Sequence, residues 1–399
     1  ATYKSQDVWF YSSNIRDAIE KADNNSTVYV QNTSESGSKN LNGQLYINKG
    51  LNIYGISSIA WDGSGNNYYD INGNYKYWGY AGVKNITVYS GALQNGMPEI
   101  DIVSGNPKKT YSEKLDTSSS AYQNVYGGGL ILNSNINISG IKISGLCGSR
   151  NNACSLITIL SGTCNLSNVW LAVNNWYTYK GRKANDNITA ASEQKTGIGN
   201  PGGGLTIYGS SAQCTIKNKV TISNCHSYFQ GGGVHVSQGG TLYNADGSNF
   251  VIKNCSASSG GAMFAYDRGH IILWAASNAT CDIVGNYVDL DAYNAYSTVS
   301  NLGYTAGSIH IAKDGFCRIG CAGGIYKIHD GGSQTQYTYA RGGTPDAGNI
   351  AVKGELVTDH TTYLYDGTGS RTSQIIISST GKWIYGNNGT TTVIGNADN

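Results

Sequence analysis

The sequence repeats one glycine-led phrase three times, as Gly202-Gly203-Gly204-Leu205-Thr206-Ile207, Gly231-Gly232-Gly233-Val234-His235-Val236 and Gly260-Gly261-Ala262-Met263-Phe264-Ala265. Leu205, Val234 and Met263 are spaced 29 residues apart. A repeat of this length, built from short apolar alternations joined by Gly, Asn and Ser, is typical of a solenoid whose coils stack on one another.

Looser copies extend the series on both sides, at Gly127–Leu130, Ala306–Ile311 and Ala347–Val352. Their uneven intervals indicate that some coils carry lateral insertions, because loops on one face of a solenoid can lengthen without disturbing the stacked core. We therefore expect a single β-helix domain over residues 1–399. Within it, residues 1–30 form an N-terminal cap and first strand, 61–125 and 176–200 form lateral insertions, and 202–399 form regular coils.

Residues alternate within each copy, and the first and third positions after the glycines are apolar. Alternation with a period of two predicts strands and not helices. A second alternating segment follows in the same coils, as Val220–Cys225 and Phe250–Cys255, in near-constant register. Two or three short strands per coil, stacked in parallel, predict an all-β fold of the β-helix (β-solenoid) type.

The pairing of these two phrases, clearest over about residues 202–288, resembles the repeats of chlamydial polymorphic outer-membrane proteins. More broadly, it is similar to the right-handed parallel β-helix, or pectin-lyase-like, superfamily. The resemblance implies a right-handed parallel β-helix with lateral loop insertions. Such phrases specify tight turns and core ladders, so they define a fold better than a function.

The two ends of the chain differ in pattern. Residues Ser13–Ala22 place Ile15, Ala18, Ile19 and Ala22 on one helical face, which predicts a short capping helix before the first strand at Val28–Val30, with Ser13 or Asn14 as N-cap. No comparable helix follows the strands at Gln374–Ser378 and Lys382–Tyr385. An uncovered strand edge is a template for another chain, so this end predicts self-assembly; the alternative is that loops or the tail cover it.

Composition narrows the class of protein. Only 13% of the residues are charged, the net charge is +2, and there are 30 tyrosines and 54 glycines, whereas a typical globular chain is about 25% charged. Nucleic-acid binding is disfavoured because the densest basic stretch is Lys180–Lys183. No apolar run of about 20 residues predicts a transmembrane span. No cofactor motif is recognised, and the start at Ala1 fits a secreted, extracellular protein whose signal peptide has been removed.

Nine cysteines lie between residues 147 and 321, an odd number that cannot close completely within one chain. Cys225 and Cys255 follow matching Asn residues and are interpreted as small core residues stacked in adjacent coils. Cys147 with Cys154, and Cys317 with Cys321, are near enough in sequence for loop disulfides or metal ligation. Disulfides are preferred, because no pair of Cys-x-x-Cys motifs accompanies them. The candidates for disulfides or intersubunit cross-links are Cys147, Cys154, Cys164, Cys214, Cys281, Cys317 and Cys321.

No catalytic constellation is convincing, although pectin-lyase-like proteins often cleave acidic polysaccharides. Asp267–His270 and the carboxylates Asp282, Asp289 and Asp291 are the best local candidates, yet turn chemistry explains them more simply. No metal site is predicted.

Interface candidates come from two places. One is the insertion Trp61–Tyr80, with Tyr68, Tyr69, Tyr75, Tyr77, Trp78 and Tyr80, which could contact a neighbouring subunit or stack on sugar rings. The other is an outward ladder that includes His235, Phe264 and His310.

These observations favour a non-enzymatic extracellular structural protein that assembles with itself into a cell-surface layer, sheath or filament. A more specific resemblance is to the sheath proteins of filamentous methanogenic archaea. The alternatives are a carbohydrate-active β-helix, either a polysaccharide lyase or a glycoside hydrolase, and a surface adhesin that binds cell-surface glycans.

Overall fold

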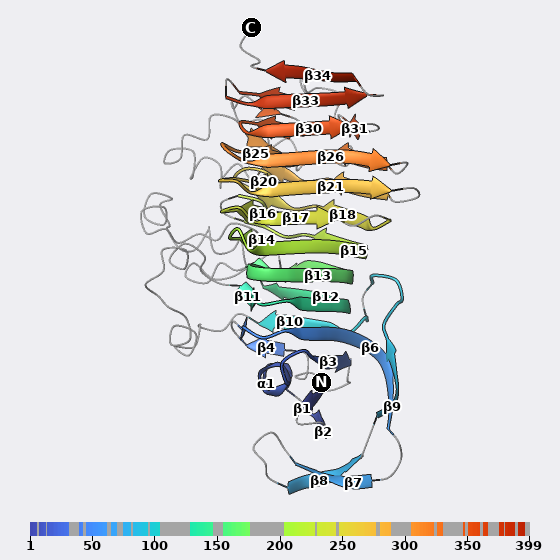
Figure 1. Cartoon of the computed structure of the whole chain (residues 1–399). Helices are drawn as coiled ribbons and strands as arrows, with labels where there is room; N and C mark the ends of the chain where they lie inside the picture. Colours follow the sequence, from blue (N-terminus) through green and yellow to red (C-terminus); the bar gives the residue numbers. More distant parts are fainter. Residues whose placement is uncertain are drawn as a thin grey trace, which may run out of the picture.

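The chain winds into a column of stacked coils (Figure 1). The computed structural model describes residues 1–5, 8–12, 14–31, 40–42, 45–61, 65–69, 75–80, 83–94, 96–103, 128–146, 155–175, 203–227, 230–244, 247–276, 280–288, 305–322, 325–329, 346–347, 350–359, 362–365, 375–378, 380–387 and 390–395. Within these ranges the secondary structure is one short helix and many short strands, most of them paired in parallel. The all-β parallel β-helix predicted from the repeats is confirmed.

The glycine-led phrases form one ladder of parallel strands, here called the first ladder. Leu205 pairs with Val234, Val234 with Met263, and Met263 with Ile309, so the phrases stack in the predicted register. The strands of this ladder, in order, are β5 (Leu45–Ile47), β11 (Gly128–Asn133), the start of β13 (Ser155–Asn175), β14 (Leu205–Tyr208), β16 (Val234–Ser237), β20 (Met263–Ala265), β25 (Ile309–Ile311), β29 (Ile350–Val352) and β32 (Ile375–Ile377).

Two more ladders run the length of the column. The second ladder contains β3 (Ser26–Gln31), β6 (Leu51–Trp61), β12 (Ile136–Leu146), the middle of β13, β15 (Ala212–Ser223), β17 (Thr241–Asn244), β21 (His270–Ala276), β26 (Phe316–Ala322), β30 (Glu355–Asp359) and β33 (Lys382–Asn387). The third ladder contains β4 (Asn40–Asn42), β10 (Glu99–Val103), the ends of β12, β13 and β15, β18 (Asn249–Lys253), β22 (Thr280–Val284), β27 (Ile325–His329) and β31 (Thr362–Tyr365).

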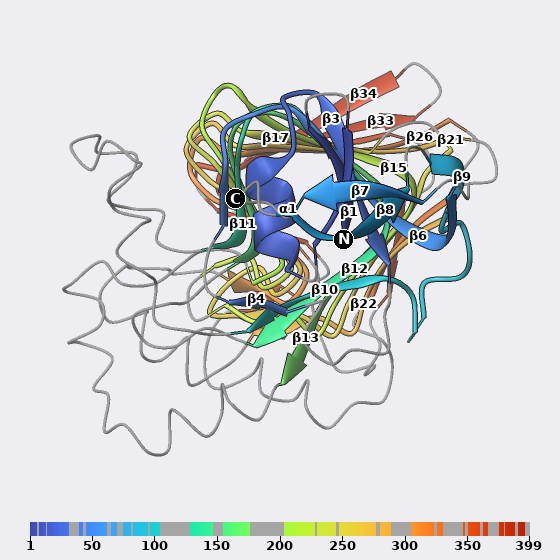
Figure 2. The ribbon, with the colours of Figure 1, turned by 90° about the horizontal axis from the view of Figure 1, so that it is seen from below.

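Strands β12, β13 and β15 bend from the second ladder into the third, so the three ladders enclose one axis (Figure 2). The smaller pairs are β19 (Ser256–Ala257) with β23 (Tyr287–Val288) and β24 (Thr305–Ala306) with β28 (Asp346–Ala347). An arm of antiparallel strands leaves the column after β6. It contains β9 (Val83–Val88), which pairs with the second half of β6, and the hairpin of β7 (Gly65–Tyr69) with β8 (Tyr75–Tyr80).

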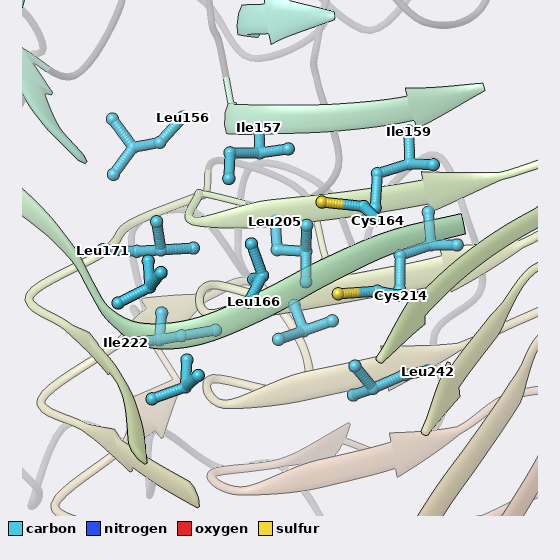
Figure 3. Packing of buried hydrophobic residues seen from close by; sticks show 14 of the residues in the cluster. Leu156, Ile157, Ile159, Cys164, Leu166, Leu171, Leu205, Cys214, Ile222 and Leu242 are labelled. Atoms are coloured by element: carbon cyan, nitrogen blue, oxygen red, sulfur yellow. The ribbon is translucent and has the colours of Figure 1, made fainter. Parts of the chain in front are cut away.

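One continuous apolar core fills the column. Leu205, Val234 and Met263 are fully buried. Figure 3 shows Leu205 beside buried residues of the second ladder, among them Cys164, Cys214 and Leu242. Inward residues of the second ladder stack as Cys164, Cys214, Leu242, Ile271, Cys317, Leu356 and Trp383. Each coil cannot bury its apolar face alone, so the stacking of neighbours supplies the hydrophobic stabilisation.

Glycine and asparagine occupy the corners for steric reasons. A Cβ on Gly232 would lie 2.2 Å from the carbonyl oxygen of Ser256 and 2.5 Å from that of Gly261 in the next coil. At the following corner, Asn224 and Asn254 adopt positive φ angles of 54° and 55°, a conformation that Asn tolerates better than most residues. The Asn that precedes the final Cys of the second sequence phrase therefore forms a turn.

The N-terminal end of the column is closed by helix α1 (Ile15–Lys21) and the antiparallel pair β1 (Thr2–Ser5) and β2 (Val8–Tyr11). Asn14 is the N-cap, and its side chain accepts a hydrogen bond of 2.9 Å from the backbone amide of Arg16. Ile15, Ala18 and Ile19 face the core and are buried. The predicted capping helix is confirmed, and α1 lies across the end of the column (Figure 2).

The C-terminal end is closed only in part. β34 (Thr390–Gly395) pairs antiparallel with β33, with Trp383 opposite Ile394. The tail thus covers the last strand of the second ladder, in line with the alternative that the tail covers this end. In the described part of the chain, no further strand pairs with β31 or β32, and the outer edge of β34 is open.

Candidate functional site

The six aromatic interface candidates of the first insertion lie on one β-hairpin. In the backbone register of β7 and β8, Tyr68 is opposite Tyr77, Tyr69 opposite Tyr75, Asn67 opposite Trp78, and Gly65 opposite Tyr80. The hairpin is a two-stranded sheet of its own. Residues that sequence analysis grouped only by composition are therefore brought into cross-strand pairs.

The outward ladder of the glycine-led phrases forms as predicted. Thr206, His235, Phe264 and His310 are successive register partners. The rings of His235 and Phe264 stack, with centroids 5.4 Å apart and an interplanar angle of 8°. Phe264 and His310 meet edge to face, with centroids 5.0 Å apart. These contacts give the first ladder an aromatic stripe on the face opposite the core.

This stripe is buried, which differs from its interpretation as an interface. His235, Phe264 and His310 are only 3%, 1% and 1% exposed. Burial lowers the pKa of both histidines to about 3, and Lys353 adds a smaller electrostatic contribution at His310. Both imidazoles are therefore neutral at physiological pH. Sequence alternation shows which residues point away from the core, but it does not show whether another part of the chain covers them.

A polar cluster that sequence analysis missed lies on the outer face of the third ladder. Glu99 pairs in register with Lys142, and Lys142 with Trp170. The Lys142 ammonium lies 3.0 Å from Oε1 of Glu99 and 4.9 Å from the centroid of the Trp170 ring. Both charged side chains are only 11% exposed.

Hydroxyl groups extend this cluster. Ser144 Oγ lies 2.5 Å from Oε1 of Glu99 and 3.2 Å from Oδ1 of Asp101, so it links the two carboxylates. The indole nitrogen of Trp170 donates to Ser223 Oγ at 2.8 Å. Two carboxylates, a lysine and an aromatic ring could bind a polar ligand. The same hydrogen bonds also compensate the buried charges, so a purely structural role accounts for them equally well.

The carboxylates that sequence analysis weighed as catalytic do not form a joint site in the described residues. Asp267 and Arg268 have positive φ angles of 45° and 62° in a turn, and their side chains pair at 3.5 Å. Their interpretation as turn residues is confirmed. Asp282 lies on β22 between Val251 and Lys327 in register. Asp289 and Asp291 lie outside the described residues.

The structure corrects part of the disulfide prediction. Cys164, Cys214 and Cys317 are free and fully buried in the core, where burial raises the pKa of the Cys214 and Cys317 thiols. Cys164 and Cys214 are register partners in adjacent coils (Figure 3). Cys225 and Cys255 are also thiols buried in the core, as expected of core residues.

The remaining cysteine candidates stay predictions. Cys281 lies on β22 and Cys321 on β26, but the structure describes only their backbone. Cys147 and Cys154 lie outside the described residues, as does the insertion 176–200.

The described residues contain neither a candidate metal site nor a membrane-spanning helix. No group of three or more His, Cys, Asp or Glu side chains is placed to hold a metal ion. Among the helices in the same part of the chain, none has the length and apolar character needed to cross a membrane.

Comparison of the sequence with known protein families and curated proteins, and of the structure with solved structures, found no match. The parallel β-helix rests on the strand ladders of this chain, and the resemblance to chlamydial surface proteins rests on the sequence phrases alone.

Proposed function

We propose that this protein is a non-enzymatic, extracellular structural protein that assembles with itself into a cell-surface layer, sheath or filament. The main support is the C-terminal end of the column, where β31, β32 and β34 each have one edge without a partner strand among the described residues. Unpaired strand edges recruit other chains unless a protein blocks them. The low content of charged residues adds support, because little repulsion opposes close packing.

The experiment is a concentration series of the purified protein, followed by sedimentation velocity and negative-stain electron microscopy. We expect ordered filaments, sheets or hoops above a threshold concentration. A protein that remains monomeric at millimolar concentration would contradict the proposal. The protein should also be located on intact cells by antibody labelling, where surface labelling is expected.

Disulfide cross-linking of the assembly is a separate part of the proposal. It now involves Cys147, Cys154, Cys281 and Cys321, because the other five cysteines are buried in the core. Assemblies run on a non-reducing gel should show multimers that reductant dissolves. The matched variants are Cys321→Ser, at a candidate cross-linking cysteine, and Cys317→Ser, at a cysteine buried in the core. If cross-links form, Cys321→Ser should remove multimers and Cys317→Ser should not.

A carbohydrate-active function is the second candidate, and the cluster of Glu99, Asp101 and Lys142 beside Trp170 favours it. A screen for sugar release from uronate-containing polymers, with and without calcium, would test this candidate. Activity that Glu99→Gln abolishes and Glu355→Gln leaves intact would support it. Glu355 is a suitable control because its ion pair with Lys382 is exposed.

A further inference from the structure

We propose that the β7–β8 hairpin is the element that joins subunits, and that it docks onto the C-terminal coil of a second copy of the chain. This inference rests on the proposed self-assembly and adds a direction to it. The contact is head to tail, between two different surfaces. Such a heterologous contact generates an open filament or, if the rotation closes, a ring.

The N-terminal end cannot simply continue the β-helix of another copy. β1 occupies the edge of β3, with Thr2 opposite Tyr29 and Tyr3 opposite Val28. Helix α1 lies across the same end with Ile15 and Ile19 buried. The edge of β3 is therefore already paired, and α1 packs against the other two strands of the first coil, β4 and β5. The cap thus lies between the first coil and a neighbouring copy, so we infer that the connection between copies uses another element at this end.

The arm places such an element on the axis of the column. β6 pairs with β3 over Ser26–Gln31 and with β12, and then continues as the first strand of the arm, where Ile56–Trp61 pair with β9. One uninterrupted strand therefore links the first coil to the arm. In Figure 1 the hairpin lies beyond the N-terminal cap, and in Figure 2 it crosses the same end of the column. A second copy stacked along the axis would meet the hairpin first.

The composition of the hairpin suits a protein contact. β7 and β8 carry six aromatic residues in cross-strand pairs and one charged residue, Lys76. Six such side chains amount to roughly 900–1,500 Å² of surface in total, divided between the two faces of the hairpin, and a stable protein interface needs about 800 Å² per partner. An isolated two-stranded hairpin is also marginally stable in water. Docking onto a partner would supply the packing surface that the hairpin lacks.

The C-terminal coil offers a complementary surface on the second copy. Its strands β31 and β32 and the outer edge of β34 leave backbone groups without a partner strand in the described part of the chain. Trp383, at the top of the inward stack of the second ladder, is only partly buried. Open edges accept strands by backbone hydrogen bonding, and a half-buried indole provides an apolar contact.

The register of the arm allows a clean deletion. Trp61 pairs with Val83, so residues 62–82 can be replaced by a two-residue Asn-Gly turn that closes β6 and β9 as a hairpin. This arm-shortened variant should melt as the wild type does, but should raise the concentration needed for assembly by about 100-fold or more. The triple variant Tyr68→Ser/Tyr77→Ser/Trp78→Ser, in the full-length chain, should also raise the concentration needed for assembly. Tyr266→Ser removes an exposed aromatic residue from the column and should assemble normally.

A mixing experiment tests the partner surface. A second variant carries a small monomeric protein fused directly after Gly395, which obstructs the C-terminal coil. Each variant alone should remain monomeric. Together they should form one-to-one dimers and nothing larger, because only the arm of the fusion and the C-terminal coil of the arm-shortened chain are available.

The possible results are distinct. Normal assembly of the arm-shortened variant would overturn this inference and leave the proposed structural function standing. Failure of the mixture to dimerise would overturn the C-terminal coil as the docking surface. Loss of glycan binding without loss of assembly would show that the hairpin binds sugars instead. A wild-type protein that never assembles would remove both proposals.

Discussion

The two ends of the column finish the same core in different ways. At the N-terminal end, Tyr3 of β1 and Ile15 and Ile19 of α1 are at most 1% exposed. At the C-terminal end, Ile377 is 6% exposed and Trp383 is only partly buried, although β34 pairs with β33. The comparison teaches that a helix and a strand pair seal the N-terminal core almost completely, whereas one antiparallel strand leaves the last coil partly exposed.

Lowering the pH should change which coils of the column unfold first. This is the largest effect on stability that we expect. His235 is faced by Thr206 and Phe264, and His310 by Phe264, Ser259 and the charge of Lys353. Their pKa values are lowered to about 3 in the folded state. The unfolded chain takes up protons below its ordinary pKa of about 6.5, so stability falls as pH drops from 6.5 towards 3.

The loss should reach about 3 kcal/mol per histidine at pH 4.5. Hydrogen exchange should show the C-terminal coils opening first at pH 7 and the coils of His235 and His310 opening early at pH 4.5. In His235→Phe/His310→Phe, the midpoint of urea unfolding should depend less on pH than in the wild type. An equal pH dependence in both proteins would contradict the assignment.

Truncation of a buried side chain should destabilise the protein more at the N-terminal end than at the C-terminal end, and this is the second-largest effect. Ile19→Ala truncates a buried side chain of the capping helix α1 and should destabilise the protein by about 2–5 kcal/mol. Ile377→Ala at the other end should cost about half as much, since the last coil can relax. The measurement is urea unfolding followed by circular dichroism. Glu20→Ala, which removes an exposed ion pair with Arg16 at 3.6 Å, should change stability by less than about 0.5 kcal/mol.

Trp383 should be the residue that protects the C-terminal end. Its indole nitrogen donates to Thr358 Oγ1 at 2.9 Å, in addition to packing on the core. Trp383→Ala should destabilise by about 2 kcal/mol and speed amide exchange in β30 and β33. Trp383→Phe keeps an aromatic ring and should cost about 1 kcal/mol through the lost hydrogen bond. If exchange rose equally in α1, the effect would not be local to this end.

Lys49 should make the smallest contribution, at the N-terminal cap. Its ammonium donates to the carbonyl of Glu20 at 2.8 Å and to that of Ala22, at the C-terminal end of α1. Lys49→Met keeps the length of the side chain and should cost about 1 kcal/mol, whereas Lys49→Arg should retain most of the interaction. The thermal midpoint of each variant, measured side by side, would detect the difference. Equal midpoints would mean that the helix end needs no such partner.

Much of the fold could be predicted because one steric requirement recurs. The glycines of each phrase allow close approach of the next coil, as at Gly232, so Leu205, Val234 and Met263 could be placed in register from the sequence. The sequence analysis did not predict the strands at Leu45 and Ile157, and it predicted the strand at Ile375 without assigning it to the first ladder. Those coils lack the glycine-led phrase, and a few alternating apolar residues are too common to identify a rung.

The sites were harder to predict for two reasons. Glu99 and Lys142 are distant in sequence, and an unknown insertion length between coils hides which outward residues become neighbours. The alternation of Lys142 and Ser144 with Ile141 and Ile143 does show that these polar residues point outward. Burial of His235 and His310 depends on contacts outside their own repeat, so no local pattern reports it.

The ladders hold their register whatever length of chain joins them. Leu205 and Val234 are 29 residues apart and Met263 and Ile309 are 46 apart, yet each is a direct strand pair. The column can therefore serve as a molecular ruler. Foreign peptides grafted between Val288 and Thr305, or between Asn175 and Gly203, would be displayed at heights fixed in steps of about 4.8 Å, while the scaffold beneath them keeps its alignment.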